Sequence, residues 1–102
     1  MAKKMLGDFT LNELRKMILA EVEKVDDDVT SVHAILTDDS GEFVFLDEDK
    51  KMQSVVAVMN QDGDFASYFL RWDVDKQQFD KCIDTVEMED IMEQHDNTNI
   101  GS

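Results

Sequence analysis

Few residues in this 102-residue chain could act as catalytic nucleophiles or bases, since it holds one cysteine and two histidines. Cys82 lies between Asp80 and Asp84, whose carboxylates disfavour the thiolate, although Lys81 favours it. His33 falls in an expected strand, where we interpret it as a surface or partly buried side chain. The sequence contains no G-x-S-x-G motif, no glycine-rich phosphate loop and no H-E-x-x-H motif. We therefore expect no catalytic residue, no cofactor and no enzymatic activity.

Carboxylates are far more abundant, with 24 Asp and Glu residues, and they raise the question of a metal site. An EF-hand loop needs an acid five residues before its glycine. The position five residues before Gly41 and before Gly63 is aliphatic in both cases. A zinc site would need more cysteine and histidine than the chain supplies. We interpret Asp26–Asp28 and Asp38–Asp39 as groups that attract divalent cations only loosely, and we expect no dedicated metal site.

The same carboxylates set the net charge, which is −14 from 24 acidic and 10 basic residues. Residues 1–25 hold five basic and four acidic side chains, whereas residues 26–102 hold five basic and twenty acidic ones. This balance argues against direct nucleic-acid binding, because phosphates are bound by basic surfaces, and against binding to anionic membranes. The acidity serves either to keep the chain solvated or to form a face that meets a basic partner protein.

Candidates for partner binding come from the expected turns, where carboxylates gather near an aromatic strand. Turns favour Asp because its side chain makes local hydrogen bonds. Alternate carboxylates on an extended strand are also spaced roughly 6.8 Å apart, which loosely imitates successive phosphates. The predicted partner-binding residues are Asp38, Asp39, Asp62, Asp64, Trp72, Asp73 and Asp75.

The elements that must position these side chains begin with a helix. Thr10 and Glu13 have the spacing of a capping box. Apolar residues then recur at helical intervals from Leu11 to Val25. Three consecutive acids, Asp26–Asp28, would be unfavourable at the negative end of the helix dipole, so the helix should stop before them. The spacing therefore predicts a helix from Leu11 to about Val25.

After the acids the pattern changes to the alternation of apolar and polar residues that is typical of β-strands. The strongest turn signal is Asp62-Gly63, because a type I′ turn needs positive φ angles. Consecutive strands joined by tight turns pair antiparallel, so we expect a meander of four or five strands. In the first strand, Val32, Ala34 and Leu36 should share a face. The predicted strands are Ser31–Thr37, Glu42–Asp47, Met52–Asn60, Phe65–Asp73 and Phe79–Ile83.

A second helix is predicted from Asp84 or Thr85 to about His95, since acids fill its first turn and apolar residues lie on one face. Residues 1–7 should form a loose lead, and residues 96–102 a frayed tail. The chain is too short for two domains. We therefore predict a single α+β domain over residues 1–102, with the folded part at 8–95. An N-terminal helix packs on an antiparallel meander, and a short C-terminal helix follows.

The apolar segments and the cysteine count indicate where the protein works. The longest apolar run, Val55–Met59, is far too short for a membrane span. No long apolar stretch follows Lys3 and Lys4, so we expect no signal peptide. A single cysteine excludes an internal disulfide and fits a reducing compartment. We expect a cytoplasmic protein with no membrane contact.

The fourth predicted strand has aromatic residues on both of its faces. Tyr68 and Trp72 alternate with Phe65 and Phe69, and one helix can cover only one side of a sheet. We expect Leu70 and one aromatic pair in the core, with Trp72 at the edge of the apolar layer. Trp72 is then either a core residue or an interface anchor, and the sequence leaves both open.

Three segments, Asp38–Glu42, Tyr68–Asp73 and Asp84–Glu89, together resemble a family of small acidic proteins of unknown function in Gram-positive bacteria. The resemblance covers about residues 30–95. It implies a strand meander followed by an acidic helix, and it carries over no catalytic residue. In size and charge alone, the chain is also similar to acidic phage inhibitors such as DNA mimics and anti-CRISPR proteins.

We therefore expect a non-catalytic, acidic protein-binding module. Its expected role is that of an inhibitor or decoy, of the phage anti-defence type, on a basic nucleic-acid-binding surface of a partner protein. Two alternatives stay open. One is a small carboxylate-rich, metal-dependent enzyme or module, and the other is an acidic adaptor or structural domain without an inhibitory role. The oligomeric state is left open too.

Overall fold

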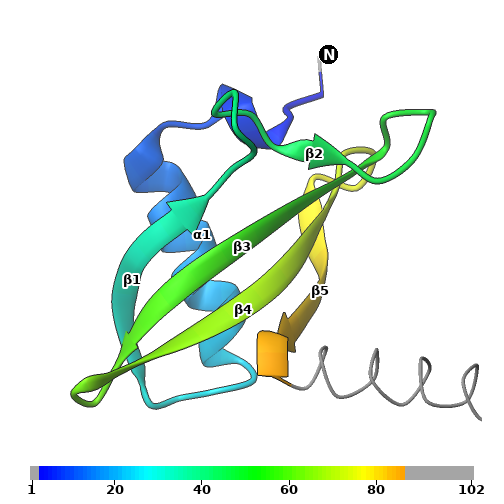
Figure 1. The fold of residues 1–102 in the computed structure, drawn as a ribbon. Helices are drawn as coiled ribbons and strands as arrows, with labels where there is room; N and C mark the ends of the chain where they lie inside the picture. The colour runs from blue at the N-terminus through cyan, green and yellow to red at the C-terminus, as the bar shows by residue number, and fades with distance from the viewer. Residues whose placement is uncertain (1–2, 87–102) are drawn as a thin grey trace, which may run out of the picture.

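A computed structural model of the chain describes residues 3–86 (Figure 1). It contains one N-terminal α-helix and an antiparallel sheet, so the predicted α+β class is confirmed. The predicted C-terminal helix and the tail lie outside the described residues, apart from Thr85 and Val86. Over residues 3–86, no helix combines the length and the apolar character that crossing a bilayer requires.

The N-terminal part holds a short 3₁₀-helix, η1 (Leu6–Asp8), followed by α1 (Leu11–Glu23). The predicted capping box is present. The Glu13 backbone N–H donates to Thr10 Oγ1 (3.1 Å), and the Thr10 N–H donates to Glu13 Oε1 (3.0 Å). That backbone N–H holds the pKa of Glu13 below its usual value. α1 ends slightly before the predicted Val25, ahead of the consecutive acids, as the helix dipole requires.

Five strands follow, and their pairing differs from a simple meander. They are β1 (Val29–Leu36), β2 (Val44–Phe45), β3 (Met52–Gln61), β4 (Asp64–Asp73) and β5 (Gln78–Asp84). The order across the sheet is β1-β3-β4-β5, and β2 also pairs with β3. The expected pairing of the first two strands with each other is therefore wrong. β3, with ten residues, is long enough to bond β1 along one part of an edge and β2 along the next.

The turn between β3 and β4 fixes the register of the two central strands. Asp62 has a φ of 45° and Gly63 a φ of 85°, as a type I′ turn requires. The strands then pair without a break from Gln61 opposite Asp64 to Met52 opposite Asp73. This turn was correctly predicted from its two residues.

The two faces of the sheet differ in what covers them. α1 crosses one side of the sheet (Figure 1), and we call this side the covered face. Its buried residues come from four strands, and they pack with Leu14, Ile18 and Val22 of α1. We call the other side the open face, because no described helix packs against it. The buried strand residues of the covered face are Val29, Gln53, Val55, Ala57, Met59, Tyr68, Leu70, Trp72 and Phe79.

β1 departs from regular alternation. Its register against β3 shifts twice, the second time between Val32 and Ala34. As a result, Val32 and Ile35 pack against the core, while Leu36 is half-exposed on the other side. The prediction that Val32, Ala34 and Leu36 share a face is therefore wrong. A β-bulge places an extra residue in the strand and reverses the faces beyond it.

A loose lead was predicted for residues 1–7, but the described part of it, residues 3–7, is packed against the sheet. Leu6 is fully buried, and its backbone N–H donates to the Gln53 side chain (2.7 Å). The Lys4 carbonyl accepts a hydrogen bond from the Trp72 indole N–H (3.1 Å). The prediction failed because a short irregular segment shows no periodicity that would mark it as packed.

Candidate functional site

The open face carries apolar side chains across the whole width of the sheet. Residues paired across strands share a face. The pairs Leu36–Val56, Val56–Phe69 and Phe69–Ile83 form a continuous apolar row from β1 to β5. No element within residues 3–86 covers this row. The most exposed apolar residues of the open face are Leu36 (50%), Val44 (47%) and Phe65 (58%).

A small pocket opens at one end of this row, where β1 has ended and β2 has not yet begun along β3. Its volume is about 180 Å³, and its lining includes Leu36, Asp38, Val44 and Val56. The pocket therefore joins aliphatic walls to one of the predicted partner-binding carboxylates. A lysine or arginine side chain, with an apolar stem and a charged head, has matching chemistry.

Asp38 and Asp39 lie exposed in the loop between β1 and β2. Asp38 Oδ1 accepts hydrogen bonds from the Ser40 hydroxyl (2.7 Å), the Ser40 N–H (2.9 Å) and the Glu42 N–H (2.9 Å). These bonds, with that of the Ser40 hydroxyl the largest cause, hold the pKa of Asp38 below its usual value. Asp38 thus presents a fixed negative charge beside the pocket.

Asp62 and Asp64 lie exposed at the β3–β4 turn, at the opposite end of the sheet. β4 has ten residues, which places the two ends of the sheet about 30 Å apart. The predicted carboxylates therefore do not form one surface. Instead, Asp38 and Asp39 lie at one end of the open face, and Asp62 and Asp64 lie at the other.

Trp72 is not available to a partner, because it is only 2% exposed. Its ring makes edge contacts with Phe9 and Phe79, with ring centroids 5.4 and 5.1 Å away. Its indole N–H is bonded to the Lys4 carbonyl. Trp72 is therefore a core residue, as is Tyr68. The prediction that Trp72 binds a partner is wrong. That prediction placed Trp72 at the edge of the apolar layer, but Lys4 and Phe9 of the N-terminal part cover the ring there.

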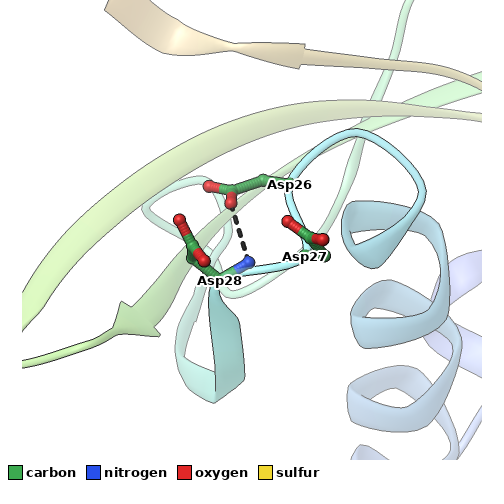
Figure 2. A group of neighbouring side chains, drawn as sticks. All are labelled: Asp26, Asp27 and Asp28. Carbon is green, nitrogen blue, oxygen red and sulfur yellow. Dashed lines mark hydrogen bonds between the residues drawn. The ribbon is translucent and has the colours of Figure 1, made fainter.

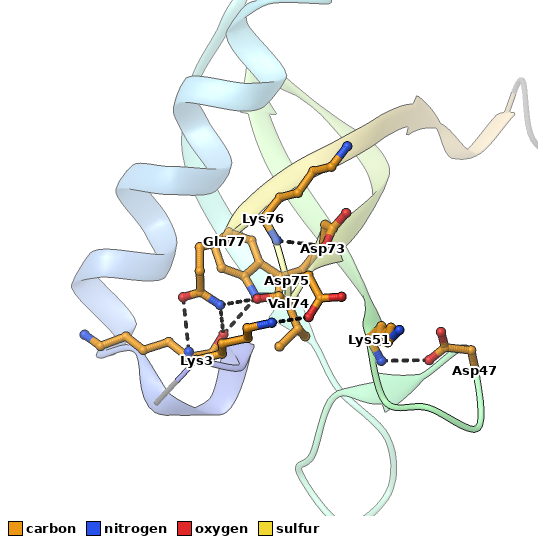
Figure 3. A network of polar contacts seen from close by, with 10 residues as sticks. Lys3, Asp47, Lys51, Asp73, Val74, Asp75, Lys76 and Gln77 are labelled. Atoms are coloured by element: carbon orange, nitrogen blue, oxygen red, sulfur yellow. Dashed lines mark hydrogen bonds and ion pairs between the residues drawn. The ribbon is translucent and has the colours of Figure 1, made fainter. Parts of the chain in front are cut away.

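Asp73 and Asp75 are also engaged within the molecule (Figure 3). Asp73 is 6% exposed, and its Oδ1 accepts the Lys76 backbone N–H (3.0 Å). Asp75 forms an ion pair with Lys3 (2.5 Å), which holds the pKa of Asp75 below its usual value. The Gln77 side chain donates to the Lys4 carbonyl in the same network (2.8 Å). The contacts of Asp75 and Gln77 fasten the N-terminal segment to the β4–β5 turn, and the Asp73 contact lies within that turn. We therefore assign both acids a structural role.

Three consecutive acids in the loop after α1 bring carboxylate oxygens within 4.8 Å of one another (Figure 2). Asp26 is already engaged, because its Oδ1 accepts the Asp28 N–H (3.0 Å) and its Oδ2 accepts the Tyr68 hydroxyl (2.6 Å) and the Gln61 amide. Burial, followed by this bond to Asp26, raises the pKa of Tyr68. Asp26 therefore ties the loop to β3 and β4, and Asp27 and Asp28 alone offer a weak ligand set for a cation.

The only candidate nucleophile and base within residues 3–86, a cysteine and a histidine, are not in contact. Cys82 lies on β5 and His33 on β1, the two opposite edges of the sheet. Burial, and then the charge of Glu21, raise the pKa of the Cys82 thiol to about 11, which keeps it protonated at neutral pH. The His33 ring lies against the Phe65 ring, with centroids 4.7 Å apart. His95 lies outside the described residues.

Sequence reasoning missed two polar residues that organise the interior, Asp26 and Gln53. Gln53 could have been identified from the sequence, because it alternates in step with Val55, Ala57 and Met59, the buried residues of β3. A polar residue in such a row needs a partner. Asp26 had no comparable signal, since nothing distinguishes it in sequence from the two acids beside it.

Neither family models, nor curated proteins, nor solved structures give a match to this chain. The resemblance to small acidic proteins therefore stays a prediction. The function has to be argued from the surfaces described above.

Proposed function

We propose that this domain is a non-catalytic binding module whose partner is a basic protein that meets the open face of the sheet. The observation that carries the proposal is the apolar surface of the open face, which nothing within residues 3–86 covers and on which Leu36, Val44 and Phe65 are about half exposed. A contiguous exposed apolar surface on a small domain marks an interaction site. The opposite face already supplies the core, so the fold does not need these side chains for its own packing.

The charge of the protein selects the kind of partner. The net charge is −14, and two copies would repel each other. Asp38 and Asp39 at one end, with Asp62 and Asp64 at the other, instead favour a surface that carries lysine and arginine around an apolar centre. Surfaces that bind nucleic-acid phosphates carry such bases. We therefore propose an inhibitor or decoy that occupies one of them.

The apolar contacts and the carboxylates have different tasks in such a complex. The apolar centre of an interface supplies most of the affinity. Charges at its rim chiefly raise the association rate and select the partner, and salt screens them. Binding should therefore weaken as salt rises, mainly through a slower association rate.

Matched variants test the proposal in an affinity capture followed by mass spectrometry. Leu36→Ser removes an open-face side chain, and Leu11→Ser removes a leucine of similar exposure on α1, 50% against 55%. Asp39→Lys reverses a charge beside the open face, and Glu23→Lys reverses one at the end of α1. A true partner is a basic protein that is lost with Leu36→Ser and Asp39→Lys and kept by both controls. Equal capture by all four variants, or no basic protein captured at low salt, overturns the proposal.

An adaptor without an inhibitory role would use the same face. The two functions differ in what happens to the partner. An inhibitor or decoy should displace nucleic acid from the captured partner in proportion to its occupancy. If the partner binds nucleic acid equally well in the complex, the adaptor function is the correct one.

A metal-dependent module has one observation in its favour, the carboxylates of Asp26, Asp27 and Asp28. Because Asp26 is engaged by Tyr68 and Gln61, we expect only a graded response to divalent cations that monovalent salt can imitate. Calorimetry with Ca²⁺, Mg²⁺ and Zn²⁺ separates the two functions. A tight stoichiometric site with a clear rise in Tm would favour the metal-dependent module.

A further inference from the structure

On β3, the buried residues of the covered face are Gln53, Val55, Ala57 and Met59. Gln53 alone among these four carries a polar side chain, and it is 4% exposed. Its Oε1 accepts the Leu6 backbone N–H (2.7 Å). A backbone N–H can only donate, so the oxygen must face Leu6 and the NH₂ group must point elsewhere. The orientation of the amide is therefore fixed by the fold.

The NH₂ group of Gln53 has no hydrogen-bond acceptor among residues 3–86. In the same part of the chain, every side-chain nitrogen or oxygen that is closed to solvent has a partner. The amide nitrogen must therefore reach solvent, and Gln53 lines a pocket of about 410 Å³. A polar side chain that the fold holds in place in the lining of a pocket is a typical recognition element for a small ligand.

The rest of the pocket defines what it can accept. Its walls include the apolar side chains of Met5, Phe43 and Phe45, and the carboxylates of Asp8 and Glu42 also line it. One ammonium group, that of Lys50, lies over the Phe45 ring at 5.8 Å. The volume is at the lower end of the usual range for ligand pockets, about 300–1,000 Å³. Two carboxylates disfavour an anion.

We propose that this pocket, between η1 and the segment that leads into β2, binds a small aromatic molecule that is uncharged or cationic and that presents a hydrogen-bond acceptor to Gln53. The aromatic body packs against Phe43, Phe45 and Met5. Its acceptor, a carbonyl oxygen or a ring nitrogen, receives the free N–H of Gln53. The site is separate from the open face and does not depend on the function proposed above.

Benzamide and benzoate are suitable probes, because they share the ring and differ in charge. The test follows the side-chain amide resonances of the ¹⁵N-labelled full chain by NMR. Benzamide should shift the Gln53 amide in a saturable way, and benzoate should bind at least about tenfold more weakly. The Gln77 amide is the internal control, since it already donates to the Lys4 and Val74 carbonyls and should not move. Gln53→Glu, which lacks the amide, identifies the Gln53 signals.

A blocking variant keeps the test independent of Gln53. Gly7 lines the pocket, its φ is not positive, and an added Cβ would meet nothing within 4 Å. Gly7→Leu should therefore fold, project into the pocket and weaken benzamide binding at least about tenfold, while Gly7→Ala, which adds a single methyl group, should weaken it less. Three results would each overturn the proposal: an unmoved Gln53 amide, equal binding of benzoate, or unchanged binding by Gly7→Leu.

Discussion

The covered and open faces of the sheet are built from similar side chains and yet differ in how far these are buried. On β3, Val55, Ala57 and Met59 point towards α1 and are at most 2% exposed. Val56 and Val58, between them, point the other way and are only half-buried. What separates the two rows is the cover that α1 and the N-terminal segment supply, not their composition. An apolar side chain in this sheet is therefore not by itself evidence of a core position.

The separation has a practical consequence for mutagenesis. Stability depends on the covered face, and binding is proposed for the open face. Substitutions on one face should then leave the property of the other largely intact. The predictions below test this separation, from the largest expected effect to the smallest.

The sharpest test compares two aromatic residues of β4, Trp72 on the covered face and Phe65 on the open face. Trp72→Ala should lower the free energy of unfolding by about 3–5 kcal/mol, since it removes a buried ring packed between Phe9 and Phe79. Phe65→Ala should change it by less than about 1 kcal/mol, because Phe65 is 58% exposed. Urea unfolding measures both. Equal losses for the two variants would mean that the open face is covered in solution.

Leu6→Ala tests whether the N-terminal segment belongs to the covered face. Leu6 is fully buried, so the variant should lose about 2–5 kcal/mol of stability. Trp72 fluorescence should shift to longer wavelength, because the segment over the indole loosens. Lys3→Ala, which removes only a surface ion pair, is the control and should leave the spectrum unchanged. A stable Leu6→Ala variant with an unchanged spectrum would mean that the N-terminal segment is a loose lead after all.

Tyr68→Phe removes the hydroxyl that bonds Asp26 and leaves the ring in the core. The variant should lose about 1–3 kcal/mol, measured by urea unfolding at neutral pH. If Asp26 is the partner that matters, Tyr68→Phe should cost little in a background that already carries Asp26→Asn. Additive losses in the double variant would show that the two groups act independently.

Alkaline pH should weaken the covered face. The fold raises the pKa of Cys82 from 9.0 to about 11 and raises that of Tyr68 above its usual 10.0. A group whose pKa is raised by folding stabilises the fold while it is protonated. This contribution is complete at pH values below the group's ordinary pKa, and it is lost as pH rises further, because the unfolded chain ionises first. The urea midpoint should therefore fall from about pH 9 upward. Tyr68→Phe and Cys82→Ala should each flatten that fall, whereas a midpoint that stays constant to pH 11 would contradict the burial of both groups.

Gly63 controls which side chains point to which face, because a slip of one residue in the β3–β4 pairing would exchange the two rows. Its φ of 85° is unfavourable for any residue with a Cβ. Gly63→Ala should therefore cost about 1 kcal/mol. Gly7→Ala, at a glycine without a positive φ, should cost less. Equal effects of the two changes on the urea midpoint would show that the turn geometry does not limit stability.

Much of the fold could be predicted from local signals. Thr10 and Glu13 marked the start of α1, and Asp62-Gly63 marked the central hairpin, because each needs only neighbouring residues. The pairing of β1 and β2 with the same edge of β3 could not be predicted, since it depends on contacts between distant segments. The face assignment within β1 failed for a related reason, because bulges have no clear sequence signature.

The candidate site was predicted in part. Asp38, Asp39, Asp62 and Asp64 are exposed as expected, but they lie at two ends of the sheet. Trp72 is buried under the N-terminal segment, and Asp73 is buried with its carboxylate bonded to the Lys76 N–H. Asp75 is exposed, but it is paired with Lys3. No local pattern announces that Lys3 and Lys4 reach a turn about seventy residues away. The sequence left open which aromatic pair of β4 lies in the core, Tyr68 with Trp72 or Phe65 with Phe69. The position of α1 decides this, because α1 covers the face that carries Tyr68 and Trp72.

The irregular register of β1 also bears on how the protein behaves when it is concentrated. β1 is an edge strand, and a regular edge would offer its free N–H and C=O groups as a template for another chain. The two register shifts in β1 interrupt the even spacing of those groups and increase the local twist. Strand-by-strand polymerisation is therefore disfavoured at this edge. The apolar open face proposed for a partner, which nothing within residues 3–86 covers, is therefore not joined by an edge strand that seeds fibres.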